Sequence, residues 1–269
     1  MNLDEHCRIG SLIYKGNIYG KDLAVKQTKG DIKEEINISK SESCESGELV
    51  RRFVRNDESQ WFLVYNYAEN GSLKKGLHHN SAASSSSSSA LPCLSWSQRI
   101  LLALDVANGL HCMHDHTQPN IVHWDVRSKN ILLDSKFKAK LANFSMARTV
   151  ADPTMAKVDV FAFGILLFEL LSGKKDLTTK DNGVNVMLYK EIREVLRLEE
   201  DRVDAIMKWM DPKLDNCYSI NGALSLAALA WIYTQEKALA RPKMDRSRLS
   251  SSELEPVSIV KVLIPVQTR

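Results

Sequence analysis

The sequence lacks a cysteine pair at metal-ligand spacing, a long hydrophobic run and an excess of charge of one sign. Its five cysteines, Cys7, Cys44, Cys93, Cys112 and Cys217, are scattered without a C-x-x-C pair. An odd and widely spaced set argues against a disulfide framework and favours a reducing compartment. We therefore expect neither a disulfide-stabilised fold nor a cysteine-based zinc site.

The charges are nearly balanced. The chain of 269 residues has 36 Lys and Arg against 33 Asp and Glu, for a formal net charge of +3. This balance, without a basic stripe, excludes a nucleic acid as an expected partner.

The most apolar stretch, Val158 to Leu171, is too short to span a bilayer and contains Asp159 and Glu169. It therefore predicts a buried core helix. The first ten residues carry Asp4 and Glu5 and no apolar run, which is unlike a secretory signal. We expect a soluble chain without a transmembrane segment.

The patterning that is present predicts a β-rich first third and a helical remainder. Strand-like runs cover Leu12–Lys15 and Leu23–Gln27, with a turn at Gly16–Gly20, and a third run covers Trp61–Tyr67. Residues 81–90 are rich in serine and predict a surface loop, because serine cannot bury apolar surface.

Four helices are predicted after this loop. Ser95 and Gln98 form a capping box for a helix that should run to about Met113. The apolar stretch predicts a helix over Val158–Ser172, ended by Gly173. Two amphipathic segments follow, Met187–Leu198 and Ala223–Ala238, the second stopped by Pro242.

Two groups of residues could carry phosphate chemistry. Lys26 ends an apolar strand, and the spacing of residues 31–40 predicts a helix that carries Glu35. Glu35 could pair with Lys26, so that the lysine holds nucleotide phosphates. A strand lysine that extends toward water is the alternative. Asp125 could accept a hydroxyl proton and Asn130 could bind a metal ion. A polar turn is the alternative there.

Four histidines, His111, His114, His116 and His123, lie near this loop and raise the possibility of a metal hydrolase. Their spacing matches no standard zinc pattern, and no cysteine pair lies nearby. The spacing therefore predicts no metal centre among them.

Taken in order, the motifs resemble a eukaryotic protein kinase domain. They are AVK at the strand lysine, EEI at the helix glutamate, LVYNYAENGSL at the hinge, HWDVRSKNILL at the catalytic loop, ANFS at the metal position, KVDVFAFGILLFELLSG at the central helix and LARP at its closing arginine. Segments such as KGDIKEEINIS and MLYKEIREVL are most similar to plant LysM receptor-like kinases, whose members sense chitin-type oligosaccharides.

The resemblance implies an α+β, two-lobed fold that uses ATP and Mg²⁺ for transfer of phosphate to serine or threonine. It places a truncated small lobe and hinge at 1–68, a linker at 69–94, the large lobe at 95–246 and a tail at 247–269. It implies these roles: Asp125 as base, Arg127 on the phosphate side, Asn130 and Asn143 at the metal, and Gly10, Ala24, Lys26, Glu35, Tyr65, Tyr67, Ala68 and Leu132 around the nucleotide.

Several positions depart from the kinase pattern. Asn143 replaces the aspartate that holds Mg²⁺, and a neutral amide is a weaker ligand for this hard cation. Trp124 replaces an arginine, and only Gly10 remains of the phosphate-covering G-x-G-x-x-G loop. The activation segment is nearly absent, so Arg241, which would pair with its glutamate, should find another partner or solvent.

Three hypotheses follow. The first is a pseudokinase that binds Mg²⁺ weakly or not at all and signals through a partner receptor-like kinase at the inner face of the plasma membrane. The second is a weakly active Ser/Thr kinase acting on a protein substrate. The third is a non-functional truncated fragment.

Overall fold

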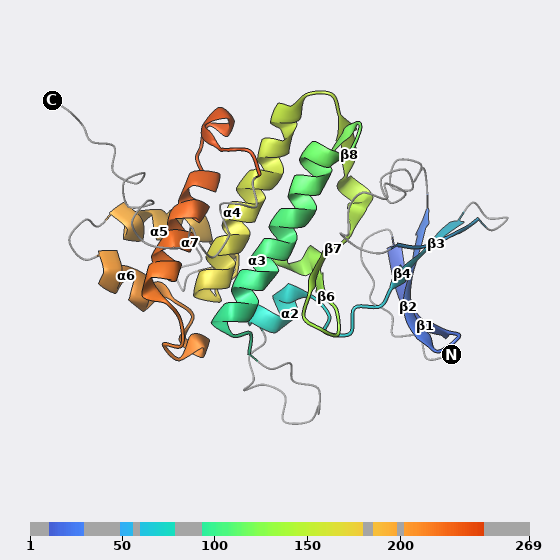
Figure 1. The fold of residues 1–269 in the computed structure, drawn as a ribbon, viewed down its shortest axis with the longest axis horizontal. Coiled ribbons are helices and arrows are strands. Elements are labelled where there is room, and N and C mark those ends of the chain that lie inside the picture. The colour runs from blue at the N-terminus through green and yellow to red at the C-terminus, as the bar shows by residue number, and fades with distance from the viewer. Residues whose placement is uncertain are drawn as a thin grey trace.

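A computed structural model describes residues 11–29, 49–55, 60–78, 93–179, 185–197 and 202–244. A four-stranded antiparallel sheet lies at one end of the molecule, and a larger, mostly helical part makes up the rest (Figure 1). The expected α+β arrangement of a small β-rich lobe and a helical lobe is confirmed. Gly10 and Glu35, both predicted at the nucleotide, lie outside the described residues.

The sheet has the strand order β1-β2-β4-β3. Its strands are β1 (Ser11–Ile18), β2 (Lys21–Lys29), β3 (Leu49–Arg55) and β4 (Gln60–Asn66). Because β2 pairs with both β1 and β4, it is an interior strand, and Lys26 faces Ile13 on one side and Leu63 on the other.

The first hairpin turns later than the sequence predicted. Gly16 lies within β1, opposite Leu23, and the turn is the two-residue loop Tyr19-Gly20. Both loop residues have positive φ, 52° and 79°. Such turns match the right-handed twist of paired strands, so twist, rather than the first glycine, decides the place of the turn.

The helical lobe contains the remaining elements. They are α2 (Leu73–His78), α3 (Trp96–His111), the π-helical turn η1 (Cys112–His116), β5 (Asn120–Val122), η2 (Ser128–Asn130), β6 (Ile131–Leu133), β7 (Ala139–Leu141), η3 (Phe144–Met146), β8 (Arg148–Val150), η4 (Pro153–Ala156), α4 (Lys157–Ser172), β9 (Leu177–Thr179), β10 (Asn185–Met187), α5 (Leu188–Arg197), α6 (Arg202–Trp209), η5 (Pro212–Leu214), α7 (Ile220–Tyr233) and η6 (Ala238–Ala240).

The local signals for α3 and α4 are confirmed. Ser95 Oγ accepts from the Gln98 amide at 3.3 Å, and Gln98 Oε1 accepts from the Ser95 amide at 2.9 Å, which completes the capping box. Gly173 ends α4 with a φ of 64°. A Cβ at Gly173 would lie 2.3 Å from Asp211 Oδ2, so both conformation and space require glycine there.

Other expectations about the helices differ from the structure. Helix α7 ends at Tyr233, well before Pro242. At this end of the helix the Thr234 hydroxyl donates to the Ala230 carbonyl at 2.9 Å. Helix α2 lies in the segment assigned to a linker, and its Leu73 and Leu77 are buried in the core of the helical lobe. Burial of these leucines gives the short helix its stability.

The expectation that the scattered cysteines form no disulfide is wrong for Cys112. Cys93 and Cys217 carry free, exposed thiols, but Cys112 is disulfide-bonded. The wide spacing of cysteines along the chain carries no information about which of them the fold brings together.

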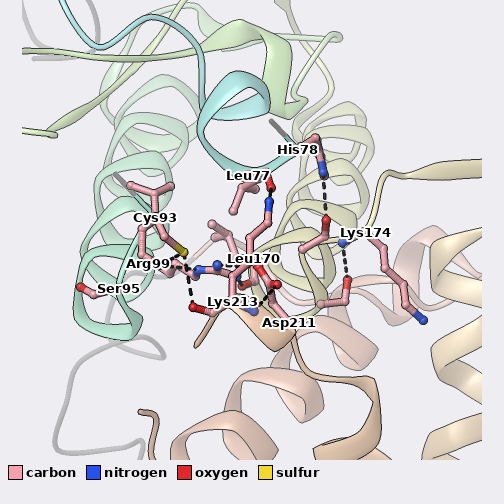
Figure 2. Close-up of polar contacts among 12 residues, drawn as sticks. Leu77, His78, Cys93, Ser95, Arg99, Leu170, Lys174, Asp211 and Lys213 are labelled. Atoms are coloured by element: carbon pink, nitrogen blue, oxygen red, sulfur yellow. Dashed lines mark hydrogen bonds and ion pairs between the residues drawn. The ribbon is translucent and has the colours of Figure 1, made fainter. Parts of the chain in front are cut away.

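A buried polar network joins three elements at the base of the helical lobe (Figure 2). Arg99 of α3 pairs with Asp211 at 2.6 Å and donates to the carbonyls of Leu94 at 3.0 Å and Leu170 at 2.8 Å. Arg99 and the Asp211 side chain are almost fully buried. The network links the start of α3 to the end of α4 and to the turn before η5.

Among the described residues, no helix is both long and apolar enough to cross a membrane.

Candidate active site

The loop that carries Asp125 follows β5 and is anchored by Asp159, a buried residue of α4. Asp159 Oδ2 accepts from the His123 amide at 2.7 Å, and Oδ1 accepts from the Trp124 amide at 2.9 Å. His114 of η1 contacts the same carboxylate at 2.9 Å. Trp124 has a φ of 64°, a conformation that costs energy for a bulky residue. The hydrogen bonds that the His123 and Trp124 amides donate to Asp159 hold Trp124 in this conformation.

Sequence reasoning missed the roles of Asp159 and His114. In the sequence, Asp159 was interpreted only as a charge that argues against a membrane span. The signal that could have found it is an acid within a helix that is otherwise apolar, because an acid is rarely fully buried without a partner.

His123 is a structural residue of the loop. Its ring packs against Phe144 with centroids 5.1 Å apart, and Nε2 lies 3.2 Å from the Ala142 carbonyl. Burial lowers the pKa of His123 and favours the neutral ring. Nε2–H then donates to Ala142, and Nδ1 accepts from the Asp125 amide at 3.3 Å. These contacts tie the loop to the segment that carries Asn143.

Asp125 stands at the centre of a compact polar cluster. Arg127 Nε lies 2.7 Å from Asp125 Oδ1, and Asn130 Nδ2 donates to Asp125 Oδ2 at 2.6 Å. Lys129 Nζ lies 3.9 Å from the same oxygen. These contacts hold the carboxylate in one orientation, which a general base requires because it must lie within hydrogen-bond reach of the proton that it accepts.

Asn143 joins this cluster from the other side. Its backbone is left-handed, with a φ of 66°. Its Nδ2 lies 3.3 Å from Asp125 Oδ2 and 3.5 Å from Asn130 Oδ1, and its Oδ1 accepts from the Ser145 hydroxyl at 3.0 Å. The structure therefore brings together Asp125, Arg127, Asn130 and Asn143, the four residues that the sequence predicted around the reaction.

These residues do not form a good magnesium site. Mg²⁺ in phosphate-binding sites is held by one or two carboxylates. Both predicted ligands here are neutral amides. The side-chain N–H groups of Asn130 and Asn143 point at Asp125. The carboxylate of Asp125 therefore accepts hydrogen bonds from the same two residues that would have to bind Mg²⁺ beside it.

The residues predicted around the nucleotide lie on β2, β4, β6 and the segment after β4. Lys26 is buried on β2, with 7% of its surface exposed. Ala24 pairs with Tyr65 across β2 and β4. Leu132 on β6 bridges to Ser72, and the Leu133 amide donates to the Gly71 carbonyl at 2.8 Å.

Tyr67 and Ala68 lie in the connection between the lobes. The Tyr67 amide donates to the Asp22 carbonyl at 3.2 Å, and Lys15 Nζ lies 4.1 Å above the Tyr67 ring. Half-buried apolar side chains and a buried lysine are residue types that suit a base and its phosphates. The set therefore fits a nucleotide.

Arg241 contacts backbone carbonyls in place of a carboxylate. It donates to Gln235 at 2.7 Å, Lys157 at 2.9 Å and Glu236 at 3.1 Å, and its guanidinium lies 4.5 Å from the Phe161 ring centroid. The expectation that Arg241 finds another partner is confirmed.

Residues 21–158 match the family described as protein tyrosine and serine/threonine kinase. The matched segment holds the Lys26 strand, the connection between the lobes and the whole Asp125 cluster.

The chain belongs to this kinase family.

Its relatives include plant LysM receptor-like kinases. It is 36% identical to chitin elicitor receptor kinase 1 of Arabidopsis thaliana over 220 residues. This match covers 73% of this chain and 34% of the relative. It is 33% identical to protein LYK5 of the same plant over 96% of this chain and 42% of the relative. It is 32% identical to LysM domain receptor-like kinase 10 of Oryza sativa subsp. japonica over 73% of this chain and 35% of the relative. The chain thus spans about a third to two fifths of the length of these curated relatives. Kinase domains of this family generally use ATP and Mg²⁺.

Proposed function

We propose that this kinase domain binds ATP but transfers phosphate poorly or not at all, and that it signals through a partner receptor-like kinase at the inner face of the plasma membrane. The observation that carries the proposal is the position of Asn143. Its amide nitrogen lies 3.3 Å from Asp125 Oδ2, where an anionic metal ligand would be needed.

The electrostatic consequence is large. Phosphoryl transfer depends on positioned positive charge that neutralises the phosphate oxygens. Without a carboxylate to hold Mg²⁺ beside the phosphates, this positive charge is missing in the transition state of phosphoryl transfer. Loss of one stabilising group of this kind typically lowers a rate by about 100- to 1,000-fold.

The short segment after the cluster supports the same proposal. Asp159 follows Ser145 by only fourteen positions along the chain. Strand β8 pairs with β5 within this interval, and η4 leads directly into α4. Little chain remains for a regulatory loop or for a surface on which a protein substrate could dock.

A weakly active Ser/Thr kinase is the second candidate. It is favoured by Asp125, Arg127 and Asn130, which keep hydrogen-bonding geometry suited to a base. A protein substrate would then be phosphorylated slowly by this chain itself.

The test is a phosphotransfer assay on the full chain with ATP and either Mg²⁺ or Mn²⁺. We expect wild type at background and Asn143→Asp to raise transfer by roughly 100- to 1,000-fold, because the carboxylate restores a metal ligand. The matched control is the double variant Asn143→Asp with Asp125→Asn, which should return to background. Wild-type transfer that is above background and equal to that of Asn143→Asp would support the weakly active kinase instead.

Partner binding needs a separate measurement. The purified chain is mixed with the kinase domain of chitin elicitor receptor kinase 1, and the mass of the species is measured by analytical ultracentrifugation. A one-to-one complex supports signalling through a partner kinase. Two unmixed species would argue against a partner of this group.

A further inference from the structure

The π-helical turn η1 places two histidines in an unusual relation. His111 ends α3 and His116 ends η1, five positions later. In an α-helix, five residues advance by about 500°, so the two side chains would point roughly 140° apart. A π-helix instead closes its hydrogen bonds between residues five apart and brings such residues to one side.

The rings accordingly meet edge to face. Their centroids are 4.8 Å apart at an interplanar angle of 87°. His116 Nε2 and His111 Nε2 are separated by 3.2 Å. The sequence predicted no metal centre here, because the histidine spacing matches no standard zinc pattern and no cysteine pair lies nearby. The π-helical turn nevertheless brings these two rings together.

The surroundings of His111 decide which of its nitrogens carries the proton. Its Nδ1 lies 3.2 Å from Asp115 Oδ2 and 3.1 Å from the Met244 carbonyl. Both are acceptors only, so in the neutral ring Nδ1 is the donor. The Nε2 lone pair of His111 then faces His116 and accepts the hydrogen bond from His116 Nε2–H in the metal-free protein. A carboxylate behind a histidine in this way is the usual arrangement at metal-ligating histidines, since it orients the ring and raises its basicity.

We propose that His111 Nε2 and His116 Nε2 together bind a divalent transition-metal ion. Two nitrogens at 2.0–2.1 Å from a tetrahedral zinc lie roughly 3.3–3.4 Å apart, and the 3.2 Å separation is close to this value. When the ion binds, it takes the place of the proton between the two nitrogens, and His116 stays neutral by carrying that proton on Nδ1.

The ligand chemistry defines the class of ion. Imidazole nitrogens favour Zn²⁺, Ni²⁺ and Cu²⁺, whereas Mg²⁺ and Ca²⁺ prefer oxygen. His116 is exposed and the His111 side chain is 29% exposed, so an ion can reach both. No third His, Cys, Asp or Glu completes the group among the described residues, and the disulfide-bonded Cys112 supplies no thiolate. Water completes the coordination.

The site involves η1, the turn that also contacts the anchor of the loop that carries Asp125. His114, between the two ligands in sequence, contacts Asp159, and Asp159 holds the His123 and Trp124 amides. A metal that clamps η1 therefore acts on the same turn that supports this loop. The proposal does not depend on whether the kinase is active.

The test is isothermal titration of the full chain with NiCl₂ and ZnCl₂, without chelators or reducing agents, in a Cys93→Ser/Cys217→Ser background that removes the exposed free thiols of the described residues. Loss of the carboxylate that hydrogen-bonds a ligating histidine typically weakens metal binding by roughly 10- to 100-fold. We therefore expect His116→Asn, which loses a ligand, to weaken the one-equivalent binding by at least about tenfold, and Asp115→Asn to weaken it less.

As a control, MgCl₂ should give no comparable binding, because Mg²⁺ prefers oxygen ligands. Because His116 is exposed, its variant should keep the wild-type circular dichroism spectrum. Equal affinity of wild type and His116→Asn, or no one-equivalent binding in wild type, would overturn the proposal.

Discussion

Glu169, near the end of α4, is a buried carboxyl with a partly unsatisfied environment. Its Oε1 accepts from the Asp176 amide at 3.1 Å, and Oε2 has no hydrogen-bond partner among the described residues. Burial raises the pKa of Glu169 to about 7. His78 lies 4.0 Å away, and burial lowers the pKa of His78. Near pH 6.5 both groups therefore favour their neutral forms, so the contact is not an ion pair.

This environment predicts a pH dependence of stability. The unfolded chain releases the Glu169 proton near pH 4.5, while the folded protein retains it to about pH 7. Glu169 therefore lowers the free energy of unfolding as the pH rises through this window, by about 3 to 4 kcal/mol at roughly 1.4 kcal/mol per pKa unit.

The variant Glu169→Gln keeps an acceptor for Asp176 and cannot ionise. We expect wild type to lose stability relative to this variant between about pH 4.5 and 7. Urea unfolding of both proteins across this range measures the difference. A constant difference would mean that Glu169 ionises normally in the folded protein.

Arg241 is held by backbone carbonyls in place of the glutamate that the kinase pattern would provide. Its guanidinium donates to three backbone carbonyls, so no carboxylate is needed. Removing the donors in Arg241→Met should lower the free energy of unfolding by about 1.5–3 kcal/mol, the usual range for hydrogen bonds from a charged group.

The salt dependence separates this arrangement from an ion pair. Carbonyl acceptors carry no net charge, so the loss in Arg241→Met should stay the same between about 0.05 and 0.5 M NaCl. A loss that shrinks strongly at high salt would point to an acidic partner.

At the scale of elements, the Arg99–Asp211 pair connects α3 to the end of α4 and to η5. Both side chains are buried, and both make further hydrogen bonds. Removing one partner of a buried pair leaves the other charge uncompensated, at a typical cost of about 3–5 kcal/mol.

We therefore expect Arg99→Met to lower the stability of the helical lobe by about this amount, measured by urea unfolding. The matched variant is Arg99→Met with Asp211→Asn, which removes the stranded charge but keeps an acceptor. It should recover part of the loss. A double variant as unstable as the sum of both single variants would show that the two residues act independently.

For the whole molecule, the first question is whether it folds as one unit that binds nucleotide. We expect a cooperative thermal transition, which would exclude a non-functional fragment. ATP at about 100 times its dissociation constant should add roughly 2.7 kcal/mol of stability by mass action.

The magnesium dependence is the informative part of this melt. Because the Asp125 cluster offers no free carboxylate, we expect the shift with ATP to be nearly the same with and without Mg²⁺. Lys26→Met is the control that should remove the shift. An ATP shift that grows markedly with Mg²⁺ would contradict the proposed loss of the metal site.

The sequence by itself determined the features whose causes are local. The Ser95 capping box, the left-handed Gly173 and the strand at 60–66 depend on neighbours within a few residues, and all are found in the structure. The Asp125 loop is a contiguous motif, so its residue types could be recognised without a fold.

Tertiary structure decided everything that depends on contacts between distant residues. The end of α7, the burial of α2 and the anchoring of the Trp124 backbone by Asp159 follow from packing that no local pattern encodes. The approach of His111 and His116 is the sharpest example. Its spacing is uninformative until the backbone is known to be π-helical, because the helical pitch decides which residues share a face.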